Sequence, residues 1–94
     1  MDAKEEARAV LEEAVAKLKT RSYQQICDLL HRSETSHVVG VFGRPYQLET
    51  HAVWDGKAGQ RLRVTVMIDS VGAIGLAPIT TSFVVTPDDF VFDE

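Results

Sequence analysis

The side chains in this sequence that are best suited to act as nucleophiles, bases or metal ligands are one cysteine and three histidines. Cys27 and His31 are four residues apart, about one helical turn, so a thiol–imidazole contact that activates a nucleophile is geometrically possible. Cys27 also falls on the apolar side of its segment, which is typical of a small core residue. His37 and His51 have no metal-ligand spacing to each other or to His31. We therefore expect no catalytic residue, no metal site and no cofactor.

Four polar residues gather on one face of a predicted hairpin. Glu49 and His51 alternate along its first strand, and Arg61 and Arg63 along its second. Such a group could bind an anionic ligand, and Glu49 with His51 could act as an acid/base pair. A solvated sheet face with weak cross-strand ion pairs explains the same residues without a function.

Aromatic residues fall on the opposite face of that hairpin. Tyr46 and Trp54 share the alternating apolar positions that a helix should cover. A pocket between helix and sheet, lined by these two residues, Phe83 and the 70–78 loop, would make the chain a small-molecule binder. The candidate ligand-binding residues are Tyr46, Trp54, His51 and Arg63.

Two apolar segments point instead to a protein partner. A strand predicted at 36–42 has no lysine, glutamate or proline to guard it against pairing with another chain. We predict that it pairs across a two-fold axis in a homodimer or is covered by the C-terminal segment. The 70–78 connection is longer than a hairpin needs, so it either folds over the core or forms an apolar binding tip. The candidate interaction residues are Val38, Val41, Phe42, Ile74 and Leu76.

The length and composition indicate one domain, residues 1–94. Apolar residues make up 45% of the chain, so it can build a core without disulfides or metal. A single cysteine fits a reducing compartment. The polar start does not resemble a signal peptide, and no stretch is apolar enough to cross a membrane. We expect a cytoplasmic protein with no membrane partner.

The net charge of −4 is placed unevenly. Residues 1–32 hold six basic and six acidic side chains, whereas residues 33–94 hold four basic and eight acidic ones. The acidic part should repel a phosphate backbone. The predicted aromatic positions face the covered side of the sheet, where bases could not stack on them. We therefore expect no nucleic-acid partner.

The elements that would position these residues begin with two helices. Asp2 and Glu5 have the spacing of a capping box, and an apolar stripe follows, which predicts a helix over 3–19. Ser22 and Gln25 repeat that spacing. They predict a short second helix over 23–31, with one kinked helix as the alternative. The apolar stripe of the first helix comprises Ala7, Leu11, Ala14 and Leu18.

From Ser36 onward the period of the pattern changes to two. Strands are predicted over 46–54 and 61–68, joined by a turn at 55–59 that contains Asp-Gly and a second Gly. We predict a register that pairs Ala52 with Leu62 and Tyr46 with Ile68. Further strands are predicted at 36–42 and 79–86. Phe90 and Phe92 either add a short terminal strand or pack against the core.

Two helices followed by four strands with short turns predict an α+β fold. The helices should pack on one face of a four-stranded antiparallel meander. This order is similar in layout to cystatin-like and NTF2-like domains, which wrap a curved sheet around a helix; such a layout implies no function. Our leading hypothesis is a non-enzymatic protein-interaction module or homodimer, and the alternative is a small-molecule-binding protein.

Overall fold

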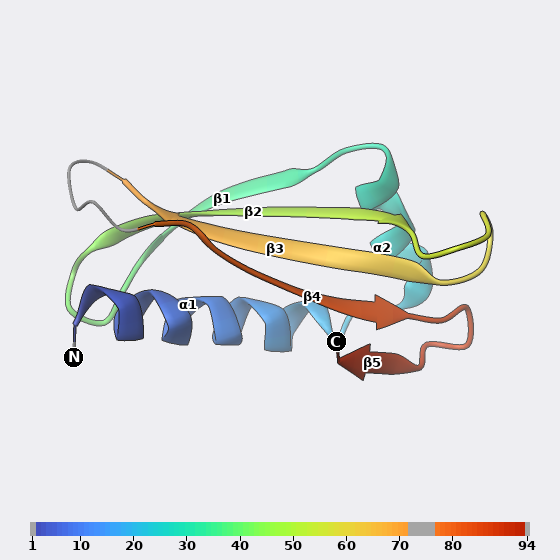
Figure 1. Ribbon diagram of the computed structural model, residues 1–94, viewed down its shortest axis with the longest axis horizontal. Helices are drawn as coiled ribbons and strands as arrows, with labels where there is room; N and C mark the ends of the chain where they lie inside the picture. Colours follow the sequence, from blue (N-terminus) through green and yellow to red (C-terminus); the bar gives the residue numbers. More distant parts are fainter. Residues whose placement is uncertain (1, 72–76, 94) are drawn as a thin grey trace.

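A helix lies along one face of an antiparallel sheet (Figure 1). The computed structural model describes residues 2–71 and 77–93. Helix α1 (Ala3–Leu18) runs beneath the sheet, and a short helix α2 (Tyr23–Cys27) with the 3₁₀ turn η1 (Asp28–Leu30) leads from it into the strands. The predicted α+β fold is confirmed.

The strands follow one another in space as they do in the sequence. Every neighbouring pair in the sheet is antiparallel. The predicted count of four strands is one too low, because the terminal strand that was one of two alternatives for Phe90 and Phe92 does form. It contains Phe92 but not Phe90, and at three residues it is too short to show a period in the sequence. The order is β1 (Glu34–Val39), β2 (Pro45–Trp54), β3 (Leu62–Ser70), β4 (Ile79–Val85) and β5 (Val91–Asp93).

Both helices begin where the capping residues predicted. The Asp2 carboxylate accepts the Glu5 backbone N–H at 2.8 Å at the start of α1. At α2 the capping box is complete, since the Ser22 hydroxyl accepts the Gln25 N–H and the Gln25 side chain accepts the Ser22 N–H. The chain therefore forms two helices rather than one kinked helix. Helix α2 ends at Cys27, earlier than predicted, because the chain tightens there into η1.

The core lies between α1 and the sheet. Leu11 and Leu18 of α1 are buried against alternate residues of the strands. Removing a side chain of this size from water contributes about 1.5–3 kcal/mol. The predicted covered face is confirmed by the buried residues of the three long strands. On that face these are Tyr46, Leu48, Thr50, Ala52, Leu62, Val64, Val66, Ile68, Phe83 and Val85. Val84 of β4 is also buried, but it lies on the other face, where it pairs with Arg63.

The predicted register of the central hairpin is wrong by two residues. Ala52 lies opposite Val64 rather than Leu62. The turn is longer than predicted, because the Asp55 N–H donates to the Arg61 carbonyl at 2.8 Å and so closes the loop around residues 56–60. A slip of two residues keeps every side chain on its own face, so the apolar pattern cannot distinguish the two registers.

The first strand also differs from its prediction of 36–42. It begins at Glu34 and ends at Val39. Gly40 then begins a turn, in which the Gly43 N–H donates to the Gly40 carbonyl at 2.9 Å. The predicted alternative in which the C-terminal segment covers this strand is wrong. That segment forms β5, which pairs with β4 at the opposite edge of the sheet (Figure 1).

Tyr23 attaches α2 to two turns at one end of the sheet. Its backbone N–H donates to Asp89 Oδ1 at 2.7 Å, and its hydroxyl donates to the Gln60 carbonyl at 2.6 Å. Asp89 has a φ of 65°, a conformation that Asp tolerates better than most residues. The β2–β3 and β4–β5 turns are thus held in place by one residue of α2.

Candidate functional site

The predicted ligand-binding residues lie on two faces of the sheet. Tyr46 is fully buried on the helix-covered face of β2, and Trp54 is half-buried at the other end of the same strand. His51 is exposed on the opposite face, where it pairs with Thr65. Arg63 shares that face and donates to Asp55 Oδ1 at 2.9 Å. The structure does not bring these four residues together.

The residues considered for catalysis or metal binding are also spread apart. His31, His37 and His51 are exposed, and Cys27 is half-buried against the core. Within residues 2–71 and 77–93, no group of three or more His, Cys, Asp or Glu side chains could hold a metal ion. Glu49 faces Met67 across the hairpin, and Arg61 lies in the turn, 3.6 Å from Asp55.

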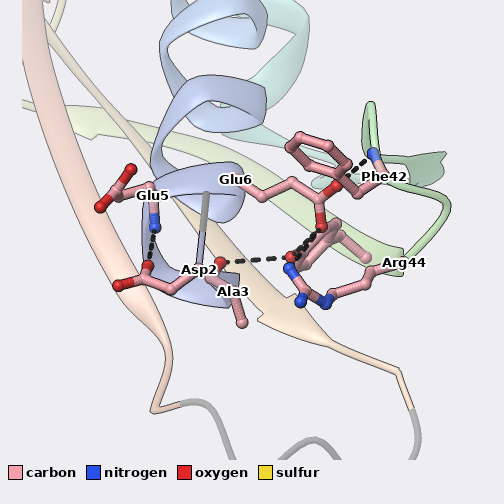
Figure 2. Close-up of polar contacts among 7 residues, drawn as sticks. Asp2, Ala3, Glu5, Glu6, Phe42 and Arg44 are labelled. Carbon is pink, nitrogen blue, oxygen red and sulfur yellow. Dashed lines mark hydrogen bonds and ion pairs between the residues drawn. The ribbon is translucent and has the colours of Figure 1, made fainter.

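One buried carboxylate organises the turn between β1 and β2 (Figure 2). Glu6 extends from α1 and is completely covered. Its Oε2 accepts the Phe42 backbone N–H at 2.5 Å, and its Oε1 accepts the Tyr46 hydroxyl at 2.7 Å. The Arg44 guanidinium lies 3.4 Å from the same Oε1. Three donors from the hairpin therefore converge on one side chain of the helix.

The protonation of this cluster follows from its contacts. Burial by itself would raise the pKa of Glu6, but the hydrogen bonds from Tyr46 and Phe42 and the charge of Arg44 outweigh it, so the pKa lies below its ordinary value of 4.5. Burial, together with the neighbouring Glu6, raises the pKa of the Tyr46 hydroxyl above 10.0. Glu6 is accordingly an anion that accepts hydrogen bonds from neutral and cationic donors.

Gly40 leaves the space that Glu6 occupies. A Cβ at this position would lie 2.5 Å from Glu6 Cδ and 2.7 Å from Glu6 Oε2, far inside van der Waals contact. The carboxylate cannot move aside without losing its donors. The close approach of helix and turn therefore requires a residue without a side chain.

The edge strand β1 offers unpaired backbone groups to a partner. The Gly40 N–H donates to the Arg44 carbonyl at 2.8 Å, so these two residues form a hydrogen-bonded pair. Antiparallel partners alternate between bonded and non-bonded pairs. Val39 and Pro45 are then a non-bonded pair, which suits a proline without an N–H. The Pro45 carbonyl is consistent with this assignment, because it points away from β1 and accepts the Val71 N–H.

The same alternation continues along β1. Ser36 and Val38 direct their N–H and C=O groups toward β2, whereas Thr35, His37 and Val39 direct theirs away from it. Within residues 2–71 and 77–93, no strand pairs with that outer side of β1. This side of the sheet, the β1 edge, thus presents three residues with unpaired donors and acceptors.

Exposed apolar side chains adjoin the β1 edge. Val39 is 67% exposed, and Val41 and Phe42 in the turn are 79% and 61% exposed. Of the predicted interaction residues, Val41 and Phe42 therefore lie at the surface, and Val38 is half-buried against the core. Ile74 and Leu76 lie outside the described residues.

Shallow grooves lie on both sides of α1. One lies between α1 and β1, has a volume of about 250 Å³ and includes Val10, Ala14 and Val38. The other lies between α1 and β4, has a volume of about 390 Å³ and includes Val15 and Ile79. Neither groove is lined by Tyr46, Trp54 or Phe83.

Among the described residues, no helix has the length and apolar character that a membrane span requires.

Comparisons with known proteins were made by family model, by sequence and by structure. No family model, no curated protein and no solved structure matches this chain. The geometry of the chain itself therefore carries the evidence about its function.

Sequence reasoning missed Glu6. Glu5 and Glu6 together form an acidic first turn that complements the helix dipole, and this gives Glu6 an ordinary explanation as a surface residue. One signal was present: Glu6 precedes Val10 by four residues and Ala7 by one, so it borders the apolar stripe. The hydrogen-bond partners of Glu6 are 36 to 40 residues away in the chain, so no local sequence pattern predicts them.

Proposed function

We propose that this chain is a non-enzymatic protein-interaction module that binds a partner through the β1 edge and the adjoining Val41–Phe42 turn. The single observation that carries the proposal is the set of outward N–H and C=O groups on Thr35, His37 and Val39. These groups suit β-strand addition, in which an extended segment of a partner joins a sheet edge through main-chain hydrogen bonds.

Apolar surface next to the edge supports this proposal. Val39, Val41 and Phe42 are all more than half exposed, so a docked strand would remove their side chains from water. Glu6 fixes the backbone at Phe42 and thereby holds the turn in one shape before a partner arrives. A preorganised surface loses less conformational entropy on binding than a loose one.

The small-molecule alternative has less support. Tyr46 and Phe83, two of the residues expected to line a pocket, are buried in the packed core. We also propose that this chain is located in the cytoplasm, because its single cysteine, the half-buried Cys27, fits a reducing compartment.

Site-specific photo-crosslinking in cells tests the proposal. A photoreactive phenylalanine analogue replaces Val39 or Phe42 at the β1 edge, and Val53 or Phe90 as matched controls, since all four are exposed. We expect discrete protein adducts from positions 39 and 42 and few from 53 and 90. Adducts mainly from the control positions, or none from the edge, would contradict the proposal.

A further inference from the structure

We propose that the partner at the β1 edge is a second copy of this chain, paired antiparallel about a two-fold axis at His37. This inference rests on the function proposed above and deepens it by naming the partner. A two-fold axis perpendicular to a sheet relates two edge strands in antiparallel order and is the commonest symmetry of soluble oligomers.

The outward backbone groups select the register. With the axis at His37, the two His37 residues form a hydrogen-bonded pair, and Thr35 of each copy pairs with Val39 of the other. All three outward residues of β1 are then paired inside the strand. An axis at Ser36 or Val38 would pair one outward residue with Ser33 or Val41, which lie beyond the strand.

The charges of the edge are compatible with self-association. Residues 35–39 carry no acidic or permanently basic side chain, although the whole chain has a net charge of −4. In this register Glu34 meets Gly40 of the second copy rather than another carboxylate. Glu34 is already paired with Arg21 of its own chain at 3.1 Å. Like charges therefore do not face each other across the axis.

Apolar surface adjoins the same contact. Val39 lies inside the paired segment, and Val41 and Phe42 follow it in the turn, so all three exposed side chains border the proposed interface. Opposed residues in an antiparallel pair share a face, so both α1 helices lie on one side of the joined sheet. The groove between α1 and β1 then lies on either side of the axis.

Pairing of β1 with β4 is the competing arrangement. Residues 79–82 of β4 extend beyond the part that β5 covers. A contact between two different edges is heterologous and leads to rings or open filaments, whereas a β1–β1 contact closes with two copies.

Single cysteines test the register in a Cys27→Ala background. Thr35, Ser36, His37, Val38 and Val39 are replaced one at a time, and a short-span thiol crosslinker is added to the folded chain. Bonded antiparallel partners have Cα atoms about 5.5 Å apart, within the reach of a disulfide or a short crosslinker. We expect His37→Cys to crosslink with itself at least tenfold faster than Ser36→Cys or Val38→Cys. Thr35→Cys and Val39→Cys should crosslink efficiently only when they are mixed.

Sedimentation of the unmodified chain provides an independent readout. A concentration-dependent dimer together with the His37 crosslink supports the inference. Self-crosslinking at Ser36 or Val38, filaments, or a monomer at every concentration overturns it. If the chain is monomeric and position 39 still gives adducts with another protein, only the homodimer fails. If those adducts are absent as well, the proposed interaction through the β1 edge is contradicted together with the homodimer.

Discussion

The two edges of the sheet are built differently. At one edge β5 covers residues 83–85 of β4, and the cover is held by the Asp89–Tyr23 hydrogen bond and by an ion pair between Lys19 and Asp93. At the other edge β1 has six residues, and the described part of the chain places no strand on its outer side. The fold therefore covers part of one edge and exposes the whole length of the other.

The open edge is nevertheless well supported. The turn that follows β1 is anchored to α1 by the buried Glu6, as Figure 2 shows, whereas a merely unprotected edge would need no such anchor. Natural proteins usually block an edge strand with charge, proline or a covering segment. An edge held in a fixed shape but left unblocked is better suited to a partner than to solvent.

Proline at neighbouring positions of β1 should give the largest effects, because one position has its N–H directed to β2 and the next has its N–H directed outward. Ser36→Pro removes an N–H that points to β2, so we expect the free energy of unfolding to fall by roughly 2–3 kcal/mol. His37→Pro removes an outward N–H, so it should cost less than about 1 kcal/mol and weaken self-association at least tenfold. Urea denaturation and sedimentation measure the two effects. Equal destabilisation by the two variants would show that the assigned strand orientation is wrong.

Filling the space beside Glu6 should have the next largest effect. In Gly40→Ala the new Cβ collides with the carboxylate, and overpacking of this kind costs about 1–3 kcal/mol. The control is the same substitution in a Glu6→Ala background, where the collision is absent and the cost should shrink. An unchanged cost in that background would place the strain elsewhere.

Acid should loosen the anchored turn. Because the pKa of Glu6 is lowered in the folded state, its contribution to stability is complete above its ordinary pKa of 4.5 and is lost as the pH falls through the lower folded value. Glu6→Gln keeps one oxygen that can accept the Phe42 N–H, and the Tyr46 hydroxyl can turn to accept from the new NH2 group, so its cost at pH 7 should be smaller than that of Gly40→Ala. The difference in unfolding free energy between wild type and Glu6→Gln should decrease as the pH falls below 4.5. A difference that stays constant from pH 7 to pH 2 would contradict the assignment.

The covered edge should respond most mildly. Asp89→Ala removes the acceptor of the Tyr23 N–H and leaves a β-carbon at positive φ, so we expect a loss of about 1 kcal/mol. Asp89→Asn keeps an oxygen acceptor and a residue that tolerates this conformation, so it should lose less than half of that. Thermal unfolding of the two variants measures the difference. Equal losses would mean that neither the hydrogen bond nor the backbone conformation at Asp89 supports the cover.

The sequence determined the layers of the fold better than the details of pairing. Capping residues and apolar period located both helix starts and the buried face of β2 and β3, because these signals are local. The hairpin register was predicted two residues away from its true position, since Ala52 meets an apolar residue on the same face in either register. A three-residue strand such as β5 leaves no periodic signal at all.

The candidate site was predicted only in part. The sequence showed that residues 37–42 contain no lysine, glutamate or proline that would prevent pairing with another strand. Val41 and Phe42 are exposed, as an interaction surface requires. The anchor at Glu6 was not visible, because three long-range donors turn an ordinary helix-surface residue into a buried one. Long-range polar contacts of this kind follow from the tertiary structure and not from any local pattern.

Amide hydrogen exchange, measured by NMR at low and high protein concentration, tests the central claim most directly. The account predicts that the amides of Ser36 and Val38 are protected at both concentrations, because they bond to β2. The amides of Thr35, His37 and Val39 should exchange rapidly when the chain is dilute and become protected when it is concentrated. Rapid exchange of these three amides at both concentrations, in a chain that remains folded, would contradict self-pairing through the β1 edge.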